Sequence, residues 1–403
     1  MENQSLFDYL KLKGSYGLLG NQSTYDENNN YPLYPALLNN TSPVFGQFVY
    51  PAYSQAYLPF GDLHWEHVKA SEIGIEFNAF RDRLHFEALH YKKSTEGFLV
   101  QVPGIAGSTG GLGNTGDLEN KGFEFSAGWN QDINKDLSFN ISANLTTIKN
   151  KVLKLNNTGY KLAAGETNPN QTEAGYPIGY FYGFVVDGVY QNAADLTSMP
   201  ASISGADAKV GDLKFKDING DKQINDNDRT LIGNPTPDLT YGASLGINYK
   251  GFNLGVDVGG VSGNQIFRIW GTSENQFSLY NYAGDKLGRW HGEGTSNRIP
   301  ILNNGRKFNR LPSTLGIESG SYFRIRNLQL GYNFPPSLLS KIYIKTFRVF
   351  VNVQNLKTFK NNSGYSPEFG GTGSQAAIAF GLDNADAQGA IPRIFTGGVS
   401  ITF

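Results

Sequence analysis

Residues 217–228, near the middle of the chain, have the oxygen-rich spacing of a calcium-binding loop. They read Asp-Ile-Asn-Gly-Asp-Lys-Gln-Ile-Asn-Asp-Asn-Asp. Calcium takes about six to eight oxygen ligands, and an EF-hand loop supplies them from positions 1, 3, 5, 7, 9 and 12, with a backbone carbonyl at position 7. The corresponding ligands in this chain are Asp217, Asn219, Asp221, the carbonyl of Gln223, Asn225 and Asp228. We therefore predict a structural calcium site in this loop.

Two positions of this loop depart from the EF-hand pattern. Position 6 is Lys222 instead of the glycine that permits the sharp turn, and position 12 is an Asp, which is shorter than the usual bidentate Glu. Asp228 is therefore expected to bind through one oxygen or through a water molecule. The alternative is an Asp- and Asn-rich exterior turn that stays solvated without a metal.

Other arrangements that could support chemistry are weaker. Residues 111–116 match the G-x-G-x-x-G dinucleotide fingerprint, but no βαβ unit surrounds them, so we expect an exterior loop there. The five histidines lack metal-ligand spacing, and there are no cysteines. Four carboxylates fall on predicted polar strand faces without any sign of a catalytic pair: Glu76, Glu87, Glu124 and Asp257. We expect no enzymatic activity.

The elements that must position these residues are strands with one apolar and one polar face. From Leu137 to Thr146 apolar and polar side chains alternate without a break, and the C-terminal run from Phe395 to Phe403 follows a similar pattern and ends on an aromatic residue. Successive side chains of a strand point to opposite faces. Segments of about ten such residues suit a tilted strand that crosses a bilayer. The pattern predicts an all-β protein, a transmembrane antiparallel β-barrel with lipid outside and water inside.

Composition agrees with a membrane barrel. Charged residues make up 17% of the 403 residues, below the roughly 25% of soluble domains. No apolar run reaches the roughly 18 residues of a spanning helix, so any crossing must be made by strands. The net charge of -1 argues against a nucleic-acid partner.

Connections alternate between short and long, which predicts the topology. Barrels of the bacterial outer membrane have short periplasmic turns and long extracellular loops. The long loop at 154–238 contains the predicted calcium loop. Arg324 and Arg326 fall on an apolar row, so we expect them above the hydrocarbon band or beyond a bulge that resets the register. About ten strands are predicted, near residues 7–19, 64–79, 83–99, 114–130, 136–153, 237–249, 252–262, 321–334, 346–358 and 391–403.

Several stretches carry a family resemblance. They include Ile73-Gly74-Ile75-Glu76-Phe77, Asn120-Lys121-Gly122-Phe123-Glu124, Gly175-Tyr176-Pro177-Ile178-Gly179, Gly233-Asn234-Pro235-Thr236-Pro237 and Arg324-Ile325-Arg326-Asn327-Leu328-Gln329-Leu330-Gly331-Tyr332. These stretches occur in the order in which the family has them, along the whole chain. The chain therefore resembles the C-terminal part of SusC/RagA-type TonB-dependent transporters of Bacteroidetes.

The resemblance implies an importer in the cell outer membrane. It would take up oligosaccharides, or in some members peptides, with a SusD-like lipoprotein as a lid and with TonB acting on a plug through the N-terminal region. That region, the plug and the first strands are missing from residues 1–403, which would form only the C-terminal part of the barrel. Such transporters use about 22 strands. We therefore expect a gene fragment or one piece of a longer polypeptide, unable to transport unaided because its sheet edges would be unpaired.

Two further alternatives stay open from the sequence. Aromatic residues of the exterior loops could stack on sugar rings, or they could serve as an interface girdle or as loop packing. These residues are Tyr50, Tyr53, Tyr57, Trp270, Tyr280, Tyr282 and Trp290. The chain as a whole could instead be a calcium-stabilised all-β surface binding module or adhesin, in which the apolar rows would be buried against a second sheet.

Overall fold

The structure is a computed structural model, and it describes most of the chain. The described residues are 7–21, 37–55, 57, 61–102, 111–156, 160–163, 168–269, 284–302, 306–339, 343–370, 378–383 and 390–403. Trp270, Tyr280 and Tyr282 lie outside them. Among the described residues, no helix combines the length and the hydropathy that a membrane-spanning helix requires.

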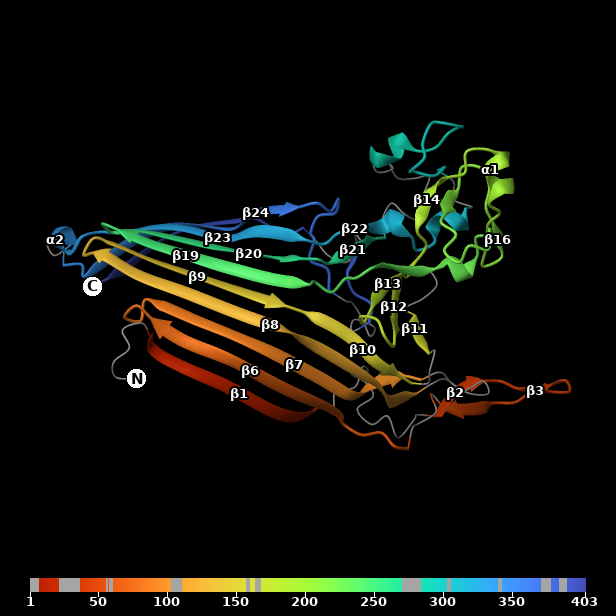
Figure 1. The fold of residues 1–403 in the computed structure, drawn as a ribbon, viewed down its shortest axis with the longest axis horizontal. Coiled ribbons are helices and arrows are strands. Elements are labelled where there is room, and N and C mark those ends of the chain that lie inside the picture. The colour runs from red at the N-terminus through yellow and green to blue at the C-terminus, as the bar shows by residue number, and fades with distance from the viewer. Residues whose placement is uncertain are drawn as a thin grey trace.

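Long antiparallel strands form one curved sheet in chain order (Figure 1). The ten strands of its main path confirm the predicted ones, with boundaries that differ by a few residues. They are β1 (Phe7–Asn21), β6 (Glu66–Ala79), β7 (Leu84–Gln101), β8 (Leu112–Asn134), β9 (Leu137–Thr147), β19 (Leu239–Tyr249), β20 (Phe252–Ser262), β23 (Tyr322–Asn333), β24 (Thr346–Lys360) and β26 (Ile394–Thr402).

One predicted strand is divided in the structure. The segment expected at 136–153 breaks at Ile148 into β9 and β10 (Lys149–Leu155). Both pieces pair with β8, whereas only β9 also pairs with β19. Within the described residues the sheet is open, because β1 and β26 each pair there with one neighbouring strand only. Closing it into a barrel requires further strands, since unpaired backbone groups are costly in lipid.

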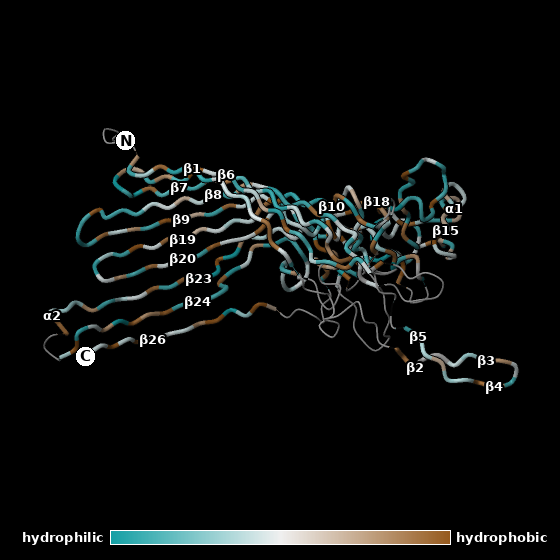
Figure 2. The backbone as a smooth tube through the Cα atoms, turned by 90° about the horizontal axis from the view of Figure 1, so that it is seen from below, coloured by the Kyte–Doolittle hydropathy of each residue, from teal (hydrophilic) through white to brown (hydrophobic). Residues whose placement is uncertain are grey.

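The register gives the sheet one apolar and one polar face. Ala143 lies opposite Ala127 on β8 and Ala243 on β19, so the apolar positions of neighbouring strands share a face. Figure 2 shows hydrophilic and hydrophobic residues alternating along the long strands. The apolar side chains are strongly exposed: Leu12 80%, Ile73 68%, Val351 57% and Phe395 70%. A soluble sandwich would bury these rows, so the sandwich interpretation is wrong.

Aromatic side chains cluster towards both ends of the apolar band. At the end with the short turns, Phe334 packs 5.0 Å from Tyr332 and 4.8 Å from Phe347, between ring centroids. At the end with the long loops, the rings of His90 and Phe123 lie 5.0 Å apart. Aromatic girdles at both interfaces are typical of barrels in lipid. We call these ends the turn end and the loop end.

The connections differ sharply between the two ends. The start of β1 and the C-terminus lie at the turn end with α2 (Pro336–Leu339), whereas small sheets gather at the loop end (Figure 1). The turn between β6 and β7 is tight, with φ of 61°, 63° and 58° at Phe80, Arg81 and Asp82. A hairpin arm projects from the loop end and consists of β2 (Leu37–Thr41), β3 (Val44–Phe45), β4 (Phe48–Val49) and β5 (Ala52–Gln55).

The segment between β10 and β19 folds into a compact unit at the loop end. Its strands are β11 (Lys161–Ala163), β12 (Asn170–Glu173), β13 (Tyr180–Gly183), β14 (Val186–Val189), β15 (Ser202–Ile203), β16 (Ala206–Asp207), β17 (Leu213–Phe215) and β18 (Thr230–Gly233). It also contains the helix α1 (Ala193–Ser198) and the 3-10 helix η1 (Asp226–Asp228). The side chain of Asn192 caps α1 by accepting hydrogen bonds from the N–H groups of Ala194 and Asp195.

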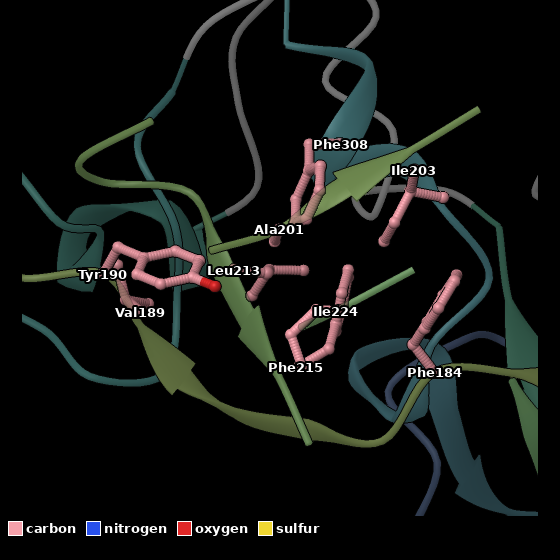
Figure 3. Close-up of a cluster of buried hydrophobic side chains, with 9 residues drawn as sticks. All are labelled: Phe184, Val189, Tyr190, Ala201, Ile203, Leu213, Phe215, Ile224 and Phe308. Carbon is pink, nitrogen blue, oxygen red and sulfur yellow. The ribbon is translucent and has the colours of Figure 1, made fainter. Parts of the chain in front are cut away.

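This unit has its own hydrophobic core (Figure 3). Phe215 stacks between Phe184 and Phe308, with ring centroids 4.7 Å and 5.2 Å away. Buried aromatic pairs of this kind add about 0.5–1.5 kcal/mol beyond the area they bury. Phe308 comes from a later connection, which contains β21 (Gln265–Arg268), η2 (Gly284–Gly288), η3 (Lys307–Arg310), η4 (Thr314–Gly316) and β22 (Ile317–Ser319); β21 also pairs with β25 (Leu382–Asp383).

Candidate functional site

The polar face of the sheet forms the wall of the candidate site. The strand register places hydroxyl and amide side chains in neighbouring rows across β8, β9 and β19. Members of these rows are Ser126, Asn140, Ser142, Asn144, Thr146, Thr240 and Ser244. A hollow of about 600 Å³ is lined in part by these residues, together with His85 and Arg326. The wall therefore offers hydrogen-bond donors and acceptors to a polar occupant.

Tyrosines on or near this sheet reach across glycines to the next strand. Tyr91 of β7 donates its hydroxyl to the carbonyl of Thr147, 3.1 Å away, by crossing Gly122 of β8. A Cβ atom at Gly122 would lie 1.8 Å from that carbonyl oxygen and 3.0 Å from the tyrosine hydroxyl. The absence of a side chain at Gly122 is therefore a requirement of the local packing, and an aromatic ring covers the glycine.

Three of the four predicted polar-face carboxylates, Glu76, Glu87 and Asp257, have partners in the structure. Glu76 and Glu87 lie directly opposite each other on β6 and β7. Lys13 of β1 pairs with both, and its Nζ lies 2.6 Å from Oε1 of Glu87. Asp257 accepts hydrogen bonds from Ser244 (2.7 Å) and Asn327 (3.1 Å). These groups are held by an ion pair and by hydrogen bonds on the wall, and sequence spacing alone did not reveal the lysine that joins the two glutamates.

The two arginines on β23 are explained by a bulge, as predicted. The pairing of β23 with β24 shifts register between Ile325 and Asn327, which moves Arg324 out of the apolar row. Arg324 is 5% exposed and donates to Thr358 (2.8 Å) and Glu368 (2.7 Å). Glu368 also accepts a hydrogen bond from Tyr322. The contact fastens the loop after β24 to the rim of the wall.

The predicted calcium loop has the turns of an EF-hand loop. The carboxylate of Asp217 accepts from the N–H groups of Gly220 (2.7 Å) and Lys222 (2.8 Å). Lys222 has φ 63°, the left-handed conformation that a glycine at position 6 adopts easily. Asp228 accepts from the N–H groups of Ile218 and Asn225, both at 2.8 Å. A carboxylate has about four lone-pair positions, so Asp217 and Asp228 both keep acceptor capacity for a cation.

The loop is anchored to the core of the loop-end unit. Ile224, at position 8, is buried and forms a parallel bridge with Ala201. Its carbonyl accepts from the N–H of Ser202, and its N–H donates to the carbonyl of Pro200, both at 2.9 Å. Among the described residues, no three His, Cys, Asp or Glu side chains form a group able to hold a metal. A calcium ion would therefore also need Asn219, Asn225 and the Gln223 carbonyl.

Two other sequence hypotheses have structural outcomes. The loop predicted over 111–116 is wrong in its extent, because Leu112 begins β8 and Gly116 pairs with Phe98 of β7. Trp290 is partly buried against the loop-end core and donates to Gln191 (3.3 Å), so it packs within a loop. Tyr50 and Tyr53 on the arm remain exposed.

Comparison with known proteins identifies the class that this fold and wall define. Residues 5–356 match the family described as TonB dependent receptor-like, beta-barrel. The chain is 32% identical over 355 residues to TonB-dependent receptor P3 of Formosa agariphila, an alignment that covers 85% of this chain and 34% of that protein. The chain belongs to the TonB-dependent receptor family, and its sheet is part of a β-barrel of the outer membrane.

The chain is also similar to a SusC receptor and to the RagAB transporter. TonB-dependent receptor SusC of Bacteroides thetaiotaomicron is 23% identical over 91% of this chain and 36% of that protein. The solved structure of the RagAB peptide transporter has the same fold, with a TM-score of 0.78, 24% identity and coverage of 100% of this chain and 42% of that chain. The chain thus spans well under half the length of the relatives it matches. The family comprises receptors and transporters, not enzymes.

Proposed function

We propose that this chain forms the C-terminal part of the barrel of an outer-membrane importer of nutrient oligomers. Oligosaccharides are the substrate class that we favour. The observation that carries the proposal is the polar wall described above, set against an exposed apolar face, in a chain of the TonB-dependent receptor family. A SusD-like lipoprotein would cover the loop end, and TonB would act through an N-terminal region of the intact protein.

The chemistry of the wall supports a sugar substrate. Its centre is mainly neutral, and amides and hydroxyls both donate to and accept from sugar hydroxyl groups. Two glycines leave room on the wall for the neighbouring asparagine side chains. A Cβ at Gly246 would lie 2.2 Å from Oδ1 of Asn140, and a Cβ at Gly242 would lie 2.8 Å from Oδ1 of Asn144. Peptides are the second candidate, supported by the likeness to the RagAB peptide transporter.

Uptake by cells that carry the intact transporter tests the proposal. Cells would receive labelled oligosaccharides or labelled peptides of similar length, with and without TonB. We expect oligosaccharide accumulation that stops when TonB is removed and when the transporter gene is deleted. Accumulation of peptides alone would replace the sugar assignment, and uptake of both labels unchanged by the deletion would refute import. Copurification of an outer-membrane lipoprotein tests the lid.

We also propose that residues 217–228 bind calcium and thereby stabilise the loop-end unit. Support comes from the oxygen spacing, the left-handed turn at Lys222 and the buried anchor Ile224. Calorimetric titration of the intact transporter should detect binding. Asp221→Asn should weaken it by about tenfold or more because a ligand charge is lost, whereas the control Asp226→Asn, at a non-ligand position, should not. Absence of binding to the unaltered protein would refute this site.

A further inference from the structure

A patch of lysines lies on the lipid-facing side of the sheet, beyond the apolar band at the loop end. Residue parity places it there: on β7, Phe86, Ala88 and His90 face outwards, and Lys92 continues the same row of the strand. The same argument holds on each neighbouring strand. The patch consists of Lys69 on β6, Lys92 on β7, Lys121 on β8, and Lys149 and Lys151 on β10.

The register brings three of these lysines into one row. Lys92 lies directly opposite Lys121, and Lys121 lies directly opposite Lys149. Like charges that face each other across strands destabilise a sheet unless an anion lies between them. The lysine row therefore requires anionic groups nearby, either from this chain or from a bound molecule.

The chain supplies only part of that negative charge. Glu119 is nearly buried, and its two oxygens lie 2.8 Å from the Nζ atoms of Lys92 and Lys121. Glu96 pairs with Lys69 at 2.6 Å. Lys149 and Lys151 are exposed. Lys151 lies opposite Glu119 in the register, but neither Lys149 nor Lys151 forms an ion pair within the described part of the chain. Asp117 lies opposite another lysine, Lys154, so it supplies no net negative charge, and the patch keeps an excess of positive charge.

The position of the patch indicates where further anions come from. The row of His90 and Phe123 marks the edge of the apolar band, and the row of Lys92, Lys121 and Lys149 is the next one towards the loop end. Lipid headgroups lie at this level, and the loop end of an outer-membrane barrel faces the cell exterior. The patch is also on the opposite side of the sheet from the polar wall, so a transported substrate does not reach it.

We propose that this lysine patch binds the phosphate-bearing headgroup of a lipid in the outer leaflet. Lys149 and Lys151 bind the phosphate, and Lys92 and Lys121 are held beside it by Glu119. The apolar surface around Phe123 contacts the acyl chains of the same lipid. The bound lipid offsets the repulsion within the lysine row and fixes this side of the barrel in the leaflet.

Native mass spectrometry of the intact transporter in detergent tests the proposal. The probes are a lipid A that carries one phosphate and the same lipid after removal of its phosphate. We expect retention of the phosphorylated lipid alone. The Lys149→Gln/Lys151→Gln variant should bind it about 30-fold more weakly, the equivalent of about 1 kcal/mol for each lysine near a charged membrane surface. High salt should also weaken binding of the phosphorylated lipid, because it screens the lysine charges.

The matched control is Lys11→Gln/Lys93→Gln, which removes two lysines from the polar face. Lys93 directly follows Lys92 in sequence but points to the opposite side. The control should retain the lipid as the unaltered protein does. Equal retention of the two lipids by the unaltered protein would overturn the proposal without recourse to any variant. Displacement of the lipid by millimolar inorganic phosphate would also overturn it, because the site would then bind free phosphate.

Discussion

Replacement of Gly122 by alanine should destabilise the barrel at the point where Tyr91 crosses β8. The new Cβ would lie 1.8 Å from the carbonyl oxygen of Thr147, a backbone atom that cannot rotate away. Either β9 or β8 must shift by more than an ångström, and the hydrogen bond from Tyr91 to Thr147 is lost. The bond contributes about 1 kcal/mol, and overpacking costs about 1–3 kcal/mol. We expect a loss of about 2–4 kcal/mol in the free energy of unfolding.

Gly128→Ala is the matched control for this change. Gly128 lies on the same strand and on the same face, but its nearest neighbour to a new Cβ, the carbonyl oxygen of Ile141, is 3.9 Å away. The control should change stability by less than about 0.5 kcal/mol. Tyr91→Phe, which removes only the hydroxyl, should fall between the two.

Urea unfolding of the intact transporter, followed by the mobility shift of the folded barrel on gels, provides the measurement. The two alanine variants add the same methyl group to the same kind of strand, so side-chain propensity cancels in the comparison. Equal midpoints for Gly122→Ala and Gly128→Ala would show that the glycine is not required by close packing. The account of tyrosines that cover glycines would then be refuted.

Three more predictions concern the loop end. Ile224→Ala should lower the free energy of unfolding of the loop-end unit by about 2–5 kcal/mol and weaken calcium binding, as measured by calorimetry. Ile224→Val should change both quantities little. Equal effects of the two substitutions would contradict the proposal that Ile224 anchors the loop. Burial raises the pKa of the Asp212 carboxyl, although the nearby Arg306 opposes the rise. The stability that Asp212 contributes is therefore lost as pH rises through its pKa in the folded protein. Asp212→Asn should reduce this dependence of the free energy of unfolding on pH, and an unchanged dependence would refute the role of Asp212. Glu368→Gln leaves the buried Arg324 without its anion, so proteinase K should cleave residues 361–370 faster, and unaltered cleavage would count against the rim contact.

Much of the sheet could be predicted from the sequence. The strand predicted near 136–153 shows unbroken alternation from Leu137 to Thr146, and the structure finds strands there, divided at Ile148. The arginines of β23 were predictable in outline, because a charged residue in an apolar row needs a bulge or an exit from lipid. The loop-end core was not predictable, since Phe184, Phe215 and Phe308 come from separate connections without a common period.

The sequence by itself determined which residues form strands and which side of each strand is apolar, because a period of two is a local property of an extended chain. Only the tertiary structure decided which strands are neighbours and in what register. Register places Lys92 opposite Lys121, Tyr91 over Gly122, and Lys13 between two glutamates. These contacts join residues that are tens of positions apart, so they depend on how whole strands align. Local sequence carries no measure of that alignment.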